Sequence, residues 1–351
     1  MAESDLFALL QKTNKGHVFK GSSDGLVPKK ERTDIEPLDA LLAGGLPRAR
    51  MTLMHGDSSS GKTFLCQKVI SAFQKRGLST VYVDVERCFD PWWFGKTGVD
   101  VDQLIVAQPP TGEDTVDLVT ESLQAKADLV ILDSAAFMLP GKVMEADAEK
   151  IFVGALARLL GPAISRWQAS NTDSVFIMIN QPRAVIGSMF NETRLPGGEA
   201  QRFAAALRLR VRRKGGWKTE ADKRIGFDMA IQVEKTKIPG VTPWSDTIIP
   251  FRFDGSLDEM DAVVALAIDR GVVQKEGAHY TFNDNRFFGA NRLRTFFTEN
   301  VTQLAELMEI LYQGQQWEGE QKAPELVLSD GSSLDSDGDD EAPDRVILDD
   351  I

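Results

Sequence analysis

The sequence predicts an α/β protein, with a twisted, mostly parallel central sheet flanked by helices and a small α/β domain after it. Three observations support this fold class. Short apolar segments alternate with helical patterns between residues 51 and 180, as in a parallel sheet with crossover helices. The first apolar segment, Met51 to Met54, leads into a glycine-bounded loop that opens a helical pattern. A later segment, Leu129 to Leu132, ends in Asp133 and delivers a carboxylate to one edge of the sheet.

The composition is that of a globular chain, with 42% hydrophobic and 26% charged residues among 351. No stretch approaches the ~18 uninterrupted apolar residues of a membrane span, and the N-terminus lacks the layout of a signal peptide. Cys66 and Cys88 are too few for a disulfide framework, and the histidines lack zinc-ligand spacing. We therefore expect a cytoplasmic protein with no membrane partner.

The negative charge is concentrated at the C-terminus. The net charge is −12, and residues 318–351 hold 12 acidic and 2 basic side chains, a net of −10. The rest of the chain is therefore near −2 (−12 minus −10), and residues 202–223 are basic. We expect residues 317–351 to form an acidic disordered tail, because this composition buries too little apolar surface to fold. The body can still present a positive face.

The glycine-bounded loop has the residue types and spacing of a phosphate-binding loop. Gly56 and Gly61 let the backbone turn its N–H groups toward a polyphosphate, and the helix N-terminus adds partial positive charge. Lys62 can reach the β- and γ-phosphates, and the Thr63 hydroxyl can hold Mg²⁺. A chance Gly/Ser turn is the alternative, but every fixed position is filled and both flanks are correct. The candidate nucleotide-binding residues here are Gly56, Asp57, Ser58, Ser59, Ser60, Gly61, Lys62 and Thr63.

Acidic groups follow two further strands, residues 79–86 and 128–134. Ligands of open α/β sheets bind at the carboxyl ends of the strands. Asp133 is the candidate second Mg²⁺ ligand. Glu86 is placed to polarise a water that attacks the γ-phosphate, and the alternative is an ordinary strand-end carboxylate. Trp92 and Trp93 come next; one ring could stack on a base, but the residues alone favour a core tryptophan pair.

Residues 181–198 form a long connection without a clear period, of a length that is commonly functional or disordered. Cations alternate there with large apolar side chains between Pro and Gly residues, a mixture suited to nucleic acid. A lid or a partner-docking loop is the alternative. The segment that follows, residues 207–212, alternates apolar residues with arginine, and we expect most of these arginines to form a solvated face. The loop residues in question are Arg183, Ile186, Met189, Phe190 and Arg194.

Three other regions have open interpretations. Lys235 and Lys237 project to one side of a strand, either as a cationic site or as edge-strand protection. Residues 1–32 hold a short amphipathic helix and a linker; the helix must dock on its own core or on a neighbour. Residues 254–316 read as a small domain with a helix at Met260 to Arg270, a hairpin around Tyr280, and two final helices.

A series of motifs in fixed order resembles the RecA family of homologous-recombination ATPases, from about Thr33 to Tyr312. The resemblance implies a RecA-type ATPase core over residues 33–253. The motifs are GDSSSGKT at 56–63, DVE at 84–86 with Asp90-Pro91, QPPTGE at 108–113, LDS at 132–134, INQ at 179–181 with Arg183, Met189-Phe190, Gly197-Gly198, and Lys235 with Lys237.

The resemblance also implies roles for single residues. Glu86 matches the family's water-activating glutamate, and Gln181 matches the glutamine that senses the γ-phosphate and couples it to the DNA loop. Lys235 and Lys237 match lysines that reach a neighbouring protomer's γ-phosphate. Asp90 and Trp93 match adenine contacts. Phe64, which stands where the family usually has a second Thr after the lysine, is a further candidate nucleotide-binding residue. The implied DNA-binding residues are Arg158 (within 153–158), Arg183, Ile186, Met189, Phe190, Arg194, Gly197 and Gly198.

The resemblance implies a DNA-dependent ATPase that uses ATP and Mg²⁺. We expect it to form a helical filament on single-stranded DNA, pair that strand with homologous duplex DNA, and exchange strands. The N-terminal helix then packs on the adjacent protomer, and the acidic tail competes with DNA for the basic surface. A RecA-fold ring helicase and an ATP-regulated mediator that binds DNA without strand exchange are the alternatives. The protein is expected in the cytoplasm of a bacterium, or of an infected host if a phage encodes it.

Overall fold

The computed structural model describes residues 3–14, 18–23, 26–141, 149–184, 193–221 and 223–312. The helices are α1 (Glu3–Thr13), α2 (Glu36–Leu41), α3 (Lys62–Lys75), α4 (Pro91–Lys96), α5 (Gly112–Gln124), the 3₁₀ turn η2 (Ala135–Phe137), α7 (Glu149–Ser170), α8 (Ala200–Ala204), α9 (Glu259–Asp269), α10 (Ala290–Glu299) and α11 (Val301–Tyr312). The strands are β1 (Lys30–Glu31), β2 (Leu46–Pro47), β3 (Arg50–His55), β4 (Thr80–Asp84), β5 (Ile105–Ala107), β6 (Leu129–Asp133), β7 (Val175–Asn180), β8 (Arg183–Ala184), β9 (Thr193–Arg194), β10 (Leu207–Glu220), β11 (Lys223–Thr236), β12 (Asp246–Arg252), β13 (Gln274–Glu276), β14 (His279–Phe282) and β15 (Asn285–Phe288).

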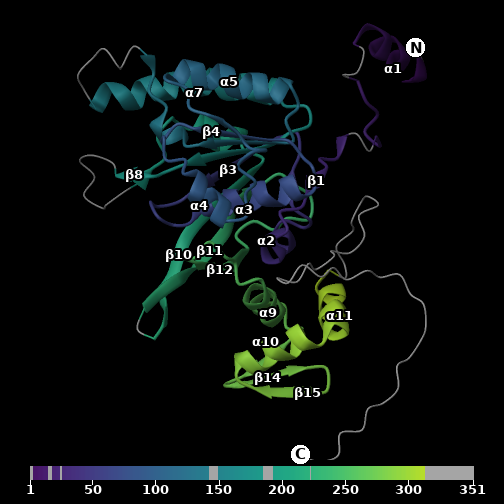
Figure 1. Ribbon diagram of the computed structural model, residues 1–351. Coiled ribbons are helices and arrows are strands. Elements are labelled where there is room, and N and C mark those ends of the chain that lie inside the picture. Colours follow the sequence, from purple (N-terminus) through teal and green to yellow (C-terminus); the bar gives the residue numbers. More distant parts are fainter. Residues whose placement is uncertain are drawn as a thin grey trace, which may run out of the picture. The chain divides into compact units, whose positions relative to one another are not determined.

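The central sheet has eight strands among the described residues, in the order β12-β11-β10-β3-β7-β6-β4-β5. All neighbours from β10 to β5 are parallel, and β11 and β12 are added antiparallel at one edge. Helices cover both faces, α5 and α7 on one and α3 and α4 on the other (Figure 1). The predicted fold class is therefore confirmed.

The alternation of side chains along each strand fills two cores. On β7, Phe176 and Met178 join the cluster that contains α5 and α7, whereas Ile177 and Ile179 join the cluster that contains α3. Because both faces are covered, the central strands are continuous apolar runs, as parallel sheets require. Their carboxyl ends meet at one edge, where the strand-end motifs must also meet.

The antiparallel edge is dominated by a long hairpin. β10 and β11 each have 14 residues and pair well beyond the point where β10 leaves its contact with β3. The predicted alternation over 207–212 is confirmed, since Leu207, Leu209 and Val211 are fully buried. Arg210 and Arg212 are exposed, as expected, but Arg208 forms a 2.7 Å ion pair with Glu234.

Residues 254–312 hold the predicted helices and a three-stranded antiparallel sheet, β13-β14-β15, in place of a simple hairpin. Phe282 and Phe297 are buried against each other, with ring centroids 5.1 Å apart. Arg270 donates to the carbonyl of Ala40 in α2 (3.2 Å), and all of these residues belong to one compact unit, Met1–Gln315. The division at residue 254 stays a prediction.

The two ends of the chain are only partly described. α1 exposes Leu6, Leu9 and Leu10, at 47%, 50% and 41%. The predicted tail, 317–351, lies outside the described residues. Among the helices that the structure describes, none is long and apolar enough to cross a membrane.

Candidate nucleotide and nucleic-acid site

The loop between β3 and α3 has the backbone that both glycines were expected to allow. Gly61 has φ +97°, and a Cβ there would lie 2.1 Å from the sulfur of Met229. A Cβ on Gly56 would lie 1.9 Å from the carbonyl oxygen of Val211. Neither position has room for a side chain. Asp57, Ser58 and Ser59 are exposed, while Ser60 is buried behind them.

Lys62 is folded back into this loop. Its ammonium donates to the carbonyls of Gly56 (2.9 Å) and Asp57 (2.7 Å), and the residue is buried. Burial lowers the pKa of Lys62, and the carboxylates of Asp133 and Glu86 oppose this shift. A bound phosphate would give the Lys62 ammonium a negatively charged partner, in place of the two carbonyl oxygens to which it now donates. The cradle and its lysine therefore fit a polyphosphate.

Thr63 and Asp133 are in direct contact. The Thr63 hydroxyl donates to Oδ2 of Asp133 (2.7 Å), and the Tyr82 hydroxyl donates to the same oxygen (2.8 Å). Burial raises the pKa of Asp133 to about 6. Such oxygen donors fit Mg²⁺. In the described part of the chain, no three His, Cys, Asp or Glu side chains form a metal cluster, so nucleotide oxygens and water would have to complete the shell.

Glu86 and Gln181 meet across the sheet. Nε2 of Gln181 donates to Oε1 of Glu86 (2.8 Å), although the residues are 95 positions apart. The Ser134 hydroxyl donates to the same oxygen (2.7 Å). β4, β6 and β7 thus bring together a candidate water-activating carboxylate and a candidate phosphate sensor. Both lie on the edge of the sheet where Lys62 lies, as the electrostatic effect of Glu86 on Lys62 also indicates.

The candidate base-binding residues lie at the start of α4. Asp90 caps this helix, its carboxylate accepting from the backbone N–H of Trp93 (2.9 Å). Trp93 is partly buried and packs against the core cluster, but Trp92 is 69% exposed. The preference for a core tryptophan pair, drawn from the residues alone, is therefore wrong for Trp92. Phe64 is buried and packs edge-on against Phe251 (4.4 Å between centroids), so it does not reach toward the loop surface.

The segment after β7 begins and ends as a short antiparallel ladder, in which Arg183 pairs with Arg194. Both residues are exposed, and Arg183 also donates to the carbonyl of Ala136 (2.9 Å) and lies over the ring of Phe137. Gly197 is buried, and a Cβ there would lie 2.2 Å from Leu160 of α7. Gly198 lies beside Ala157. Ile186, Met189 and Phe190 lie outside the described residues.

The local structure of residues 153–158 differs from the expectation of a loop. They lie inside α7, where Arg158 is exposed. The expectation of a loop here came from the resemblance alone. DNA contact by Arg158 stays a prediction, now from a helix surface.

Lys235 and Lys237 point to the same side, as predicted. Both donate to the carbonyl of Phe203, at 2.9 and 3.1 Å, and Lys235 also donates to the carbonyl of Arg202 (2.6 Å). Phe203, whose backbone carbonyl accepts from both lysines, is itself 70% exposed. At Lys235, β11 pairs with β10 on one side, while its pairing with β12 ends at Gln232, so both interpretations of the lysine pair stay predictions.

Sequence reasoning missed several residues that support the site. Ser134 and Tyr82 donate to the two candidate carboxylates, Glu86 and Asp133, and the backbone carbonyl of Phe203 accepts from both candidate lysines. Asp84 is buried and accepts from the side-chain amide of Gln108 (2.8 Å). Ser134 and Gln108 belong to the quoted motifs, but nothing in the sequence shows which side chains they touch.

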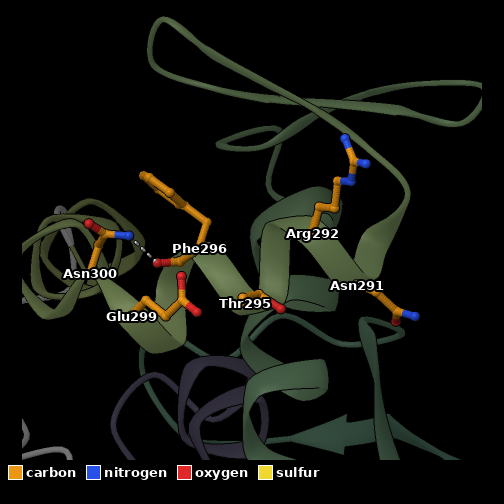
Figure 2. A pocket seen from close by; sticks show the side chains of 6 residues that line it. All are labelled: Asn291, Arg292, Thr295, Phe296, Glu299 and Asn300. Atoms are coloured by element: carbon orange, nitrogen blue, oxygen red, sulfur yellow. Dashed lines mark hydrogen bonds between the residues drawn. The ribbon is translucent and has the colours of Figure 1, made fainter. Parts of the chain in front are cut away.

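A separate surface pocket lies on α10, away from all these residues. Figure 2 shows its lining, including the hydrogen bond from the Asn300 amide to the carbonyl of Phe296 (2.8 Å). Its lining mixes one basic and one acidic side chain without convergent polar groups, and we assign it no ligand. The lining residues are Asn291, Arg292, Thr295, Phe296, Glu299 and Asn300.

Comparison with known proteins gives one consistent result. The model of the RecA N-terminal domain matches residues 32–253. "Protein RecA" of Thioalkalivibrio sulfidiphilus is 34% identical over 273 residues, 76% of this chain and 79% of the relative. "Protein RecA" of Cereibacter sphaeroides is 33% identical over 308 residues, 86% and 89% of the two chains. "Protein RecA" of Acinetobacter baumannii is 34% identical over 275 residues, 77% and 78%.

Proposed function

The chain belongs to the RecA family of homologous-recombination ATPases, and we propose that it polymerises on single-stranded DNA, pairs that strand with homologous duplex DNA and exchanges strands. The observation that best supports the proposal is the 2.8 Å hydrogen bond from Gln181 to Glu86. This bond joins Glu86, the candidate hydrolytic carboxylate, to Gln181, the first residue of the candidate DNA loop. A change in the nucleotide bound near Glu86 is therefore transmitted to the DNA loop through this hydrogen bond.

The candidate site suits phosphoryl transfer by positioning and charge stabilisation. Bound ATP and Mg²⁺ supply the transferable phosphoryl group and the cation that neutralises its charge. Lys62 and the loop N–H groups bind the phosphates, and Thr63 and Asp133 hold the ion. Within the described residues, both hydrogen bonds to Glu86 end on Oε1, which leaves Oε2 to accept from a water. The candidate base contacts are Asp90 and Trp93.

Two exposed features support assembly of protomers. Lys235 and Lys237 both donate to the backbone carbonyl of Phe203, an exposed residue, so this surface offers cationic and apolar groups suited to a neighbour's nucleotide edge. The leucines of α1 are about half exposed, and an 11-residue helix of this kind is marginal without a docking partner. We assign both features to contacts between protomers of the filament. The filament would form in the cytoplasm of a bacterium or of a phage-infected cell.

Electron microscopy with single-stranded DNA and a non-hydrolysable ATP analogue tests the assembly. Helical filaments support the proposal, closed rings favour a helicase, and neither form favours a mediator. A strand-exchange assay then tests activity, with Lys62→Ala and Glu86→Ala as controls that remove phosphate binding and water activation. Nucleotide-dependent DNA binding without strand exchange would contradict the recombinase assignment.

A further inference from the structure

Two buried amide side chains join the ends of segment 181–198. Asn180, at the end of β7, and Gln201, in α8, are both fully buried. Asn180 Nδ2 donates to Gln201 Oε1 (2.6 Å) and to the carbonyl of Pro196 (3.0 Å). Gln201 Nε2 donates to the carbonyls of Pro196 (2.7 Å) and Gly198 (3.0 Å). We call these two side chains and two carbonyls the amide clamp.

The amide clamp uses the full hydrogen-bonding capacity of its N–H groups. Each amide carries two donors, and each has two acceptors at 2.6–3.0 Å. In a buried site, fully satisfied polar networks are rigid, whereas the loss of one partner leaves the remaining polar groups buried without a hydrogen bond, which is unfavourable. Residues 196–198, which we call the return segment, also pack against α7, because Gly197 and Gly198 lie against Leu160 and Ala157.

The amide clamp reaches the site through Gln181. The Oδ1 atom of Asn180 accepts from the backbone N–H of Gln181 (2.8 Å), and the Gln181 side chain then donates to Glu86 (2.8 Å). Asn180 therefore fixes the backbone from which Gln181 extends, and Gln201 fixes Asn180 against the return segment.

We propose that Gln201 is a positioning residue for the reaction: its buried amide holds the two ends of segment 181–198 so that Gln181 faces Glu86. This inference rests on the proposed function, in which Gln181 couples ATP to DNA. Gln201 touches neither reactant and acts through Asn180 and Gln181. Its loss uncouples DNA binding from hydrolysis and leaves the phosphate-binding loop intact.

Gln201→Leu tests this role, with Gln168→Leu as the matched control. Gln168 also donates its amide to a carbonyl near α8, that of Ala204 (3.2 Å), but from an exposed position outside the clamp. In the full chain, DNA-stimulated ATP turnover of Gln201→Leu should fall at least tenfold. Binding of a fluorescent ATP analogue without DNA should stay within twofold. Gln168→Leu should match the parent in both measurements.

Gln201→Glu provides a test that does not depend on the stability of the leucine variant. A protonated carboxyl can still donate to one carbonyl of the clamp, whereas a carboxylate faces two carbonyl oxygens. Its turnover relative to the parent should be near one at pH 6 and fall several-fold at pH 8. In a positioning role, binding of the fluorescent ATP analogue stays within twofold of the parent across this pH range, while turnover falls. A role limited to folding would lower nucleotide binding and turnover together as the carboxyl ionises.

Each outcome is decisive. Parental turnover in Gln201→Leu, equal loss of nucleotide binding and turnover, or a pH-independent Gln201→Glu ratio would overturn the positioning role. If the leucine variant does not fold, the glutamate pH series decides. A parent chain without DNA-stimulated hydrolysis would instead overturn the proposed function, and the inference with it.

Discussion

At the residue scale, the candidate hydrolytic site depends on how one carboxylate is held. Glu86 accepts two hydrogen bonds on Oε1, from Ser134 and Gln181, and these donors come from different strand ends. Glu86 is a candidate from its place at the end of a predicted strand, and the resemblance implies the role of Gln181. The motifs did not identify the Ser134 contact, since it arises only when the strand ends become neighbours.

Replacing Ser134 by Ala should reduce DNA-stimulated kcat by up to about tenfold, because one hydrogen bond that orients Glu86 is lost, worth about 1 kcal/mol. The Kd for nucleotide should not change. Single-turnover hydrolysis with saturating DNA measures the effect. Ser165→Ala, on the exposed surface of α7, is the control. Equal kcat in the two variants would show that Gln181 alone orients Glu86.

A second residue-scale feature is a pair of acidic side chains, Glu36 and Asp39, in the first turn of α2. Glu36 shares Arg32 with Asp39, at 2.7 and 3.8 Å, and Oε2 of Glu36 has no hydrogen-bond partner in the described structure. Burial raises the pKa of Glu36 to about 7 and that of Asp39 to about 6, from ordinary values of 4.5 and 3.8. The folded state therefore binds protons that the unfolded state releases.

The free energy of unfolding should fall as pH rises from about 4 to about 7, because the folded pKa values are raised. In Glu36→Gln, the free energy of unfolding should fall over this pH range by at most about 3 kcal/mol less than in the parent, since one pKa unit corresponds to about 1.4 kcal/mol. The variant should then be more stable than the parent at pH 8. Urea unfolding across this pH range measures it, with exposed Glu121→Gln as the control. A parallel pH dependence of variant and parent would contradict the prediction.

At the element scale, the sequence pattern predicted the central strands and the covering helices. Strands that are buried on both faces are continuous apolar runs, and the covering helices have apolar residues at helical spacing. The pattern did not predict how far β10 and β11 extend, nor the β8–β9 ladder, because both depend on pairing between segments rather than on composition. Likewise α7 contains Arg158 within a helix although the motif order implied a loop there. The exposed ring of Trp92 shows the same limit, since the residue pattern did not distinguish it from Trp93.

The outer part of the β10–β11 hairpin is a cationic surface built on one aromatic ring. The guanidiniums of Arg213 and Arg224 lie 4.4 and 5.1 Å from the ring centroid of Trp217. Behind it, Phe227 and Phe253 pack at 5.9 and 5.7 Å. The aromatic cluster holds both cations outward, in a geometry suited to phosphates.

The double variant Arg213→Ala/Arg224→Ala should weaken DNA binding and lower the slope of log Kd against log salt by about two, because two phosphate contacts are lost. Fluorescence anisotropy at several salt concentrations measures both quantities. Arg166→Ala is the control, because Asp117 already pairs with that arginine at 2.6 Å. An unchanged slope would remove the hairpin from the DNA surface.

At the scale of the whole molecule, charge is divided between a near-neutral body and a strongly acidic terminus. Residues 318–351 contribute −10 of the net −12. A polyanion of this size repels DNA electrostatically. The range of this repulsion decreases with salt, from about 10 Å at 0.1 M to about 3 Å at 1 M. This effect depends on charge alone and needs no particular docking site.

Deleting residues 318–351 should raise duplex-DNA affinity about tenfold at low salt and lower the Mg²⁺ needed for binding. The gain should shrink as salt rises, because screening already weakens the repulsion. Filter binding with a salt titration measures it. A chain whose tail is replaced by a neutral Gly/Ser segment of equal length should behave like the deletion. An unchanged binding curve would exclude the electrostatic role of the tail.

The sheet order also has a consequence for the folding of the nascent chain. β7 lies between β3 and β6, although it follows both in the sequence by at least 40 residues. Until residues 175–180 have left the ribosome, β3 and β6 have no strand between them, and Gln181, which follows β7, cannot reach Glu86. The contact between Gln181 and Glu86 therefore forms late, so a chain interrupted before β7 holds the glycine loop without the Gln181 side of the candidate site.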